Sequence, residues 1–556
     1  MSQPPPFPPS QPTRKLFFVV ALVAVALGLY FRFARLDGKY FWLDETHSAS
    51  AAAGYSVYEL DTLFDGTPRR LVDLQTYLRI RSTNDPTPGR PLRATIDSLR
   101  SLPENAPLYF LTLRLWADAC GDSPTALRAY SATLAVLGGL LLVGLCRELG
   151  FDRAASACVV CWWSLSPFLV VYSQEARTYG LFAVWTISAD WLLLRAMRLQ
   201  SWPNWLGYIL TATAGLYTHM FLGLLLIAQG LFVAMIGLTQ SSAEQRRRLY
   251  LRFAIAGVCI VVAFLPWFAI VLRNTERGFL TNFLGREVAL HYLVQSWVEG
   301  LAALFVDFGL HGSTPARAVN VAISLVIVAG VFWSAWYVAR NAPARTRLFL
   351  LTTGGIPPLI LIGCDLAFGG TRSETVRFWL PGLVSIGLTF SYAIAEACES
   401  GSRSAAIAGP LLLAAAAGSC LRSAAESTWW HKGGVVSQNN TYMIDHREIR
   451  IRLAELAAMP GSLLVVERGR WTIYELMAMS TICDPRVEWL GIADAETFEP
   501  PPNRTLYLYH APRLLERLAE RGRPAERLEP TWMFYRVEPT PANRETPHQT
   551  PLDVAK

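Results

Sequence analysis

The sequence predicts a mainly α-helical protein that crosses a membrane many times, and three observations support this prediction. Of the 556 residues, 52% are hydrophobic and only 17% are charged, against about 25% charged in an average soluble domain. The mean hydropathy is +0.28. The apolar residues gather in runs of roughly 20, the length that crosses a bilayer as a helix. This composition excludes a disordered chain, a coiled coil and a collagen-like repeat, and it argues against a single soluble enzyme.

Eleven apolar runs qualify as transmembrane helices. The first, 16–34, is broken only by Arg32. It is longer than the apolar core of a signal peptide and no small-residue cleavage site follows, so we expect it to be retained. The segment 204–239 is too long for one helix and short for two, and we divide it at Tyr217-Thr218-His219. The runs after the first are 125–146, 154–172, 178–197, 204–219, 220–239, 253–272, 317–339, 348–366, 378–398 and 404–421.

Basic residues collect in alternate loops between the runs. The densest group, 246–248, precedes the seventh run. By the positive-inside rule these loops are cytoplasmic, which places the N-terminus inside and the C-terminus outside. The net charge of +7 then reflects topology and contact with anionic membrane lipid, and it requires no nucleic-acid partner. We expect a multi-pass protein of the plasma (inner) membrane.

The chain divides into four expected parts. Residues 1–15 read as a disordered cytoplasmic tail, and 541–556 as a disordered C-terminal tail. Between them, 16–424 form the transmembrane domain, with a long outer loop at 35–124 that carries juxtamembrane helices. A small α/β domain at 425–540 is expected on the outer side. Its expected strands are 463–467 and 506–509, and its expected amphipathic helices are 449–458 and 513–521.

The nine cysteines give no metal motif. Most lie in apolar runs, where buried thiols are ordinary packing residues. Cys120 and Cys483 lie outside the runs and could pair, but nothing in the sequence requires it. Zinc-type spacing of Cys and His is missing. The sequence therefore requires no cofactor, and it leaves a divalent cation as an open question.

The first polar cluster, 41–48, follows the first run. Two adjacent carboxylates, Asp44 and Glu45, come after Trp42 at the expected membrane surface. They could be a general base and a second acid that orients it or holds a cation. The alternative is an aromatic interface residue followed by a helix cap, with Asp44 as the N-cap.

Two further clusters lie at the same expected boundary. The short loop 172–179 contains Glu175 and Arg177, which form either a surface ion pair of little value or an acid and a base that face a cavity. His219 lies at the division of 204–239. A single histidine at a helix end is more often a satisfied structural residue than a ligand.

The fourth cluster, 372–381, enters the run 378–398 with Arg372 and Arg377. An arginine at a helix start opposes the helix dipole, and a bound phosphate would offset this because a guanidinium matches phosphate geometry. The alternative is that these side chains reach lipid head groups. Taken together, acids and arginines at one boundary suit a lipid-phosphate donor that carries a sugar.

Four stretches resemble the GT-C superfamily, in particular glycosyltransferase family 39, the dolichyl-phosphate-mannose–protein mannosyltransferase-like proteins and their bacterial lipid-sugar-transferase relatives. Trp42-Leu43-Asp44-Glu45 resembles the family's first-loop motif. The other matches occur in family order from 16 to about 398, and the C-terminal region has no counterpart that we can name. They are Pro107-Leu108-Tyr109-Phe110 through Ala126-Leu127-Arg128, Ser166-Pro167 through Tyr179, and Arg377-Phe378-Trp379-Leu380-Pro381.

The resemblance implies an enzyme that moves a sugar from a polyprenyl-phosphate donor to a lipid, glycan or protein acceptor at the outer face, by inverting displacement. Asp44 matches the family's general base, supported by Glu45, and Glu175 matches its second acidic position. Arg177 and Arg377 would bind the donor phosphate. The candidate substrate contacts are His47, Tyr109, Gln174, Tyr179 and His219.

The sequence also departs from the family pattern. Asn105-Ala106-Pro107 stands where many relatives read His-Pro-Pro, so the role of that histidine is absent or passes to Glu104 or His47. Residues 69–100 look like an extra segment that could shape acceptor choice. The alternative function is a transporter or lipid flippase, which would place ionisable groups near the bilayer midplane; Asp190 is the acid well inside a run. A third hypothesis is a non-catalytic envelope scaffold.

Overall fold

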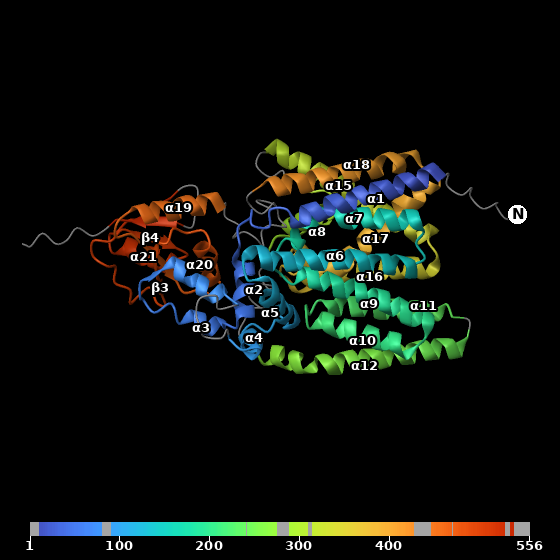
Figure 1. Ribbon diagram of the computed structural model, residues 1–556, viewed down its shortest axis with the longest axis horizontal. Helices are drawn as coiled ribbons and strands as arrows, with labels where there is room; N and C mark the ends of the chain where they lie inside the picture. Colours follow the sequence, from blue (N-terminus) through green and yellow to red (C-terminus); the bar gives the residue numbers. More distant parts are fainter. Residues whose placement is uncertain are drawn as a thin grey trace, which may run out of the picture. The chain divides into compact units, whose positions relative to one another are not determined.

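The computed structural model describes residues 11–80, 90–240, 242–274, 288–309, 314–426, 446–469, 471–528 and 534–538. The expected tails lie outside these residues, 541–556 wholly and 1–15 in part, as do parts of the expected extra segment 69–100. Backbone contacts divide the chain into two units. The helical unit comprises Met1–Tyr40, Ser48–Gly54 and Ile80–Met443. The sheet unit comprises Phe41–His47, Tyr55–Arg79 and Ile444–Lys556 (Figure 1).

Every predicted apolar run falls on helix. Among the residues that the structure describes, seven helices are long and apolar enough to cross a membrane, or eight if the bent pair α7–α8 is one span. The described part of α1 and the helix α11 are apolar but shorter, so the number eleven stays a prediction. The helices on the runs are α1 (Gln11–Phe33), α6 (Pro124–Glu148), α7 (Arg153–Leu165), α8 (Pro167–Ser173), α9 (Tyr179–Leu199), α10 (Trp202–Leu216), α11 (Leu222–Leu238), α12 (Ala243–Arg273), α15 (Thr314–Asn341), α16 (Ala344–Phe368), α17 (Leu380–Glu399) and α18 (Arg403–Ala425).

Shorter helices lie between these. They are α2 (Leu43–Ala53), α3 (Val57–Asp61), α4 (Leu92–Leu99), α5 (Leu108–Cys120) and α14 (Leu290–Ala303), with 3₁₀ turns η1 (Leu71–Leu78) and η3 (Val376–Trp379). The long helices run side by side in Figure 1.

Burial separates central helices from peripheral ones. The apolar window that includes α17 is 78% buried and that of α9 is 72% buried, whereas those of α12, α15 and α18 are each 22% buried. Gly387 allows the tight packing of α17, because a Cβ there would lie 2.0 Å from the Trp162 ring on α7. The peripheral helices therefore present apolar faces, which suits contact with lipid chains.

The span formed by α7 and α8 is bent by 54° at Ser166-Pro167. Proline lacks a backbone N–H, so the last carbonyls of α7 lose their helical donors. Arg32 of α1 replaces those donors, since its guanidinium donates to Trp163 O at 2.5 Å and to Ser164 O at 2.6 Å. In return, Gln174 after α8 donates to the α1 carbonyl of Phe31 at 2.6 Å. A side chain of α1 thus satisfies carbonyls at the end of α7, and a side chain after α8 satisfies a carbonyl at the end of α1.

The sheet unit contains a six-stranded sheet in the order β1-β3-β2-β4-β6-β5, with β3, β2 and β4 parallel. The predicted strands 463–467 and 506–509 are β2 and β4, and the predicted amphipathic helices fall on α19 and α21. The elements are β1 (Arg69–Arg70), α19 (His446–Ala458), β2 (Leu463–Glu467), α20 (Thr472–Ser480), β3 (Glu488–Ile492), β4 (Leu506–Tyr509), α21 (Pro512–Glu520), β5 (Glu526–Arg527) and β6 (Phe534–Val537).

Part of the first loop completes this sheet, a grouping that the sequence did not predict. β1 pairs antiparallel with β3, and the backbone N–H of Gly66 donates to Gly491 O at 2.9 Å. Gly491 is also needed for packing, because a Cβ there would lie 2.7 Å from the Phe64 ring. Residues 55–79 and the C-terminal residues therefore share one core.

An acid and a histidine meet at the end of β4. The Glu475 carboxylate, on α20, lies 3.1 Å from His510 Nε2 and accepts a hydrogen bond from the Tyr509 hydroxyl at 3.2 Å. Burial raises the pKa of Glu475 to about 8 and lowers the pKa of His510 to about 4. Near neutral pH the pair is therefore held in its uncharged form.

The first prediction concerns Arg32. Arg32→Met keeps an unbranched side chain that can remain buried, but the carbonyls of Trp163 and Ser164 lose their donors. Each unsatisfied buried group costs about 1–3 kcal/mol, so we expect a clear fall in the unfolding temperature of the purified protein. The control is Arg153→Met, at an exposed position. Equal unfolding temperatures for the two variants would contradict this role.

The second prediction concerns Glu475. Because its pKa is raised from 4.5 to about 8, its contribution to stability is full below about pH 4.5 and is lost as the pH rises through 8. Glu475→Gln should therefore unfold at a higher temperature than wild type at pH 8 and at a similar one at pH 5. The exposed Glu520→Gln should keep the wild-type pH dependence. A variant less stable than wild type at pH 8 would instead show that the pair is ionised.

Candidate active site

The loop between α8 and α9 is buried throughout, which a surface ion pair would not be. Glu175 is 0% exposed and Arg177 is 9% exposed. The Arg177 guanidinium donates to the Ser48 hydroxyl on α2 at 3.2 Å. The loop follows the short helix α8, which begins after the bend at Ser166, and it ends where α9 begins at Tyr179. The structure thus places an acid and an arginine inside the helical unit.

Arg377 reaches the same loop from the turn η3. Its guanidinium lies over the Tyr179 ring, 5.5 Å from the centroid, and its side chain lies close to the hydroxyl of Tyr172. A cation over an aromatic face is attracted by the ring quadrupole. Arg377 is 8% exposed. Residues 200 positions apart in the sequence therefore meet at one place.

His219 lies in the five-residue break between α10 and α11. Its ring stacks on Phe182 at 4.6 Å between centroids, and its Nδ1 accepts the Phe221 backbone N–H at 3.3 Å. Arg177 and Arg377 both act electrostatically on the His219 ring, so the histidine lies near both arginines and is held by packing.

Two candidate contacts have structural partners. Gln174 caps the end of α1 through Phe31 O and Ala34 O. Tyr109 is fully buried, and its ring packs against those of Phe110 and Tyr130. These contacts give both residues a role in holding the helices, which the sequence did not indicate.

The Trp-Leu-Asp-Glu motif begins α2. The helix starts at Leu43, so Asp44 lies within the first turn and is not the N-cap that the capping alternative required. Instead, Glu45 accepts the backbone N–H of Trp42 at 3.4 Å and is fully buried. Asp44 is half-buried. Glu45 thus fixes the helix start, and the carboxylate beside it keeps some access to solvent.

The residues that follow the motif contact α20 within the sheet unit. The Thr46 hydroxyl lies 2.8 Å from the carbonyl oxygen of Tyr474, to which it can donate. The His47 ring packs edge-on against Tyr474 at 5.1 Å and against Trp471 at 6.2 Å. His47 is therefore packed among aromatic rings of the C-terminal region.

Sequence reasoning assigned no role to Arg128 or Lys39. Arg128 is 1% exposed and donates to three carbonyls that precede the motif, those of Leu36, Lys39 and Tyr40. Burial, followed by the charge of Arg128, lowers the pKa of Lys39 to about 7, and Glu175 opposes the shift. Arg128 belongs to the matched Ala126-Leu127-Arg128 stretch. An arginine near the start of an apolar run was the feature of the sequence that could have indicated its structural role.

Asp365 was also missed. It lies near the end of α16 with a side chain that is 0% exposed. It accepts the backbone N–H of Ser373 at 2.6 Å, the Ser373 hydroxyl at 2.7 Å and the Arg372 guanidinium at 3.1 Å. Arg372 is thus paired within the protein. Asp365 fixes the segment that leads into Arg377.

Two chemical expectations can be checked within the described residues. No group of three or more His, Cys, Asp or Glu side chains there is arranged to hold a metal ion. The nine cysteines, Cys120 and Cys483 included, are free thiols.

Comparisons with known proteins give one family match. Residues 104–267 match the family model described as dolichyl-phosphate-mannose-protein mannosyltransferase. This stretch covers less than a third of the chain, and it includes the 107–128 and 166–179 motifs and His219. No curated protein matches the chain.

Solved structures give low-identity matches. The crystal structure of ArnT from Cupriavidus metallidurans bound to undecaprenyl phosphate is 15% identical, with 95% of this chain and 98% of that chain covered and a TM-score of 0.48. The apo form of the same protein is 14% identical, with 94% of this chain and 97% of that chain covered and a TM-score of 0.47. The Archaeoglobus fulgidus oligosaccharyltransferase tethered with an acceptor peptide is 13% identical, with 86% of this chain and 64% of that chain covered and a TM-score of 0.41. TM-scores below 0.5 do not by themselves establish a common fold.

The family model matches the part of the chain that contains the buried loop with Glu175 and Arg177. Residues 104–267 are thus similar to the dolichyl-phosphate-mannose-protein mannosyltransferase family, in agreement with the resemblance found in the sequence motifs of this stretch.

Proposed function

We propose that this protein transfers a sugar from a polyprenyl-phosphate donor to an acceptor at the outer face of the membrane. The observation that carries the proposal is the meeting of Arg177 and Arg377 near His219, with Glu175 in the same buried loop. Ionisable side chains buried in a membrane protein are candidates for a functional site, and Arg177 and Arg377 differ from Arg32 and Arg128, which donate to backbone carbonyls. A phosphate ester on a lipid tail fits, because the tail needs apolar surroundings and the phosphate needs guanidinium groups.

The proposed chemistry is a direct displacement. The acceptor hydroxyl oxygen attacks the anomeric carbon, the bond from that carbon to the phosphate oxygen breaks, and the lipid phosphate leaves with the electron pair. Asp44 takes the hydroxyl proton as general base. Arg177 and Arg377 stabilise the charge that grows on the leaving phosphate. Configuration at the anomeric carbon is inverted.

The motif that contains Asp44 resembles the family's first-loop motif and begins the helix α2. Ser48 accepts the hydrogen bond from Arg177. Glu45 and Arg128 hold the start of this helix and the backbone before it. Glu175 is proposed to orient the acceptor or the sugar.

The transporter alternative rests on Asp190. Its Oδ1 accepts a hydrogen bond from Gln229 at 2.8 Å, and Gln229 accepts one from Tyr208 at 2.8 Å. These three side chains are buried and lie on α9, α11 and α10. Polar bonds of this kind link helices in membranes, so the network does not favour transport.

The third prediction tests the base. Asp44→Asn keeps the size of the side chain but cannot take the proton, so kcat should fall at least about 100-fold. The measurement is release of polyprenyl phosphate from a radiolabelled polyprenyl-phosphate sugar by the purified protein. The control is Asp97→Asn, on an acid that pairs with Arg100 at 2.8 Å. Full activity in Asp44→Asn would overturn the mechanism.

The fourth prediction tests the phosphate site. Arg377→Gln removes a charged donor, and hydrogen bonds to charged groups are worth roughly 1.5–3 kcal/mol, so kcat/KM for the donor should fall about 10- to 100-fold. Arg340→Gln is the matched control, because Arg340 lies over the Trp336 ring at the end of α15. An unchanged kcat/KM for Arg377→Gln would remove this residue from the donor site.

A further inference from the structure

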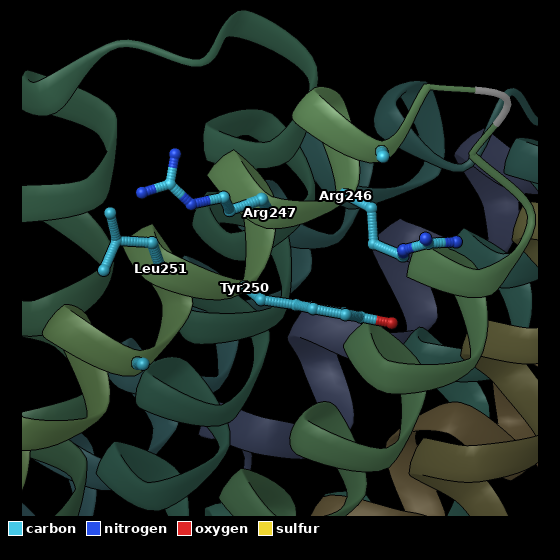
Figure 2. Close-up of a pocket in the computed structure, with 6 residues that line it drawn as sticks. Arg246, Arg247, Tyr250 and Leu251 are labelled. Carbon is cyan, nitrogen blue, oxygen red and sulfur yellow. The ribbon is translucent and has the colours of Figure 1, made fainter.

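A shallow groove lies on the first turns of α12, on a face of that helix that carries both arginine and apolar side chains. Its volume, largely open to the surroundings, is about 550 Å³. Figure 2 shows the Arg246 side chain on the same flank as Tyr250, and Arg247 on the flank of Leu251. The lining residues are Ala243, Arg246, Arg247, Tyr250, Leu251 and Ala254.

The groove has a rigid wall on its Tyr250 flank. The Tyr250 hydroxyl donates to Ala234 O on α11 at 2.9 Å. The ring also packs on Gly237, where a Cβ would lie 2.4 Å from it. The wall is therefore set by helix packing and not by a mobile side chain.

The arginines of this segment have different partners. Arg248 pairs with Glu244 at 3.4 Å, and Arg252 contacts Gln200 and the Trp202 ring. Arg247 has only a long contact with Glu244, at 3.8 Å. Arg246 is half-buried and has no ion pair or hydrogen bond among the residues that the structure describes. The Arg246 guanidinium is therefore available to an anion from outside the chain.

The depth of these arginines matches lipid head groups. α12 has 31 residues, about 46 Å at 1.5 Å per residue, which exceeds the roughly 30 Å hydrocarbon core. Its apolar run begins at 253, so Arg246 lies roughly 10 Å beyond the core on the same scale. Below the groove, one exposed stripe continues along the helix through Leu251, Val258 and Leu265, which are 55%, 63% and 49% exposed.

We propose that this groove, which we name the α12 groove, binds an anionic phospholipid. The head-group phosphate pairs with Arg246 beside the Tyr250 wall, and Arg247 on the opposite flank adds positive charge. One acyl chain follows the stripe from Leu251 to Leu265. A phospholipid is favoured over a soluble anion, because the stripe offers apolar surface that only an acyl chain would cover. The site is separate from the cluster around Arg377 and does not rest on the proposed reaction.

The fifth prediction is tested by native mass spectrometry of the full chain released from detergent. Phosphatidylglycerol should stay bound, while phosphatidylcholine with the same acyl chains should bind less. At about 1 kcal/mol for each arginine near an anionic surface, Arg246→Gln should weaken phosphatidylglycerol binding about five-fold. The double variant Arg246→Gln with Arg247→Gln should weaken it more than ten-fold.

The matched control is Arg248→Gln, which removes the same charge from the same helical turn but from a residue outside the groove. It should keep wild-type binding. Equal loss in Arg246→Gln and Arg248→Gln would reduce the effect to general surface charge and overturn the site. Equal binding of the two lipids, or preference for a polyprenyl phosphate, would also overturn it. If the double variant fails to fold, the comparison of the two single variants decides the matter.

Discussion

The helical unit depends on the need to satisfy backbone carbonyls where a helix ends among apolar side chains. Water is absent from a bilayer core, so the protein must supply the donors itself. The bend at Ser166 exposes the carbonyls of Trp163 and Ser164, and Arg32 donates to both. Gln174 in turn caps α1. Because these bonds allow the span to break, the loop that holds Glu175 and Arg177 can lie inside the unit.

Arginine side chains have three different roles in this chain. Arg32 and Arg128 are buried donors for backbone carbonyls and hold helix ends. Arg177 and Arg377 meet beside His219, where their charges suit a phosphate ester. Arg246 lies in a groove on a peripheral helix. The same guanidinium group thus supports structure, the proposed donor site and the proposed lipid contact, and burial together with the available partners separates these roles.

The motif that begins at Trp42 is held by interactions that lie far apart in the sequence. Glu45 caps its own helix, and Arg128 fixes the preceding backbone. Thr46 and His47 contact α20, which lies more than 400 residues later. The family resemblance has no counterpart for this C-terminal region. Through these contacts the C-terminal region helps to hold the residues that follow the motif.

The sequence by itself determined the helices, since hydrophobic runs of membrane length are local signals. It indicated 154–172 as one run, and the bend at Ser166-Pro167 was found only in the structure. It also identified β2 and β4, because a short apolar run between turn residues is a signal contained in the neighbouring residues of the sequence. It could not predict that β1 joins β3, that Asp365 fixes Ser373, or that Arg128 holds Tyr40. These contacts join residues brought together only by packing. Tertiary structure alone decided which arginines face carbonyls and which meet around His219, because a side chain's partner depends on the helix packed against it.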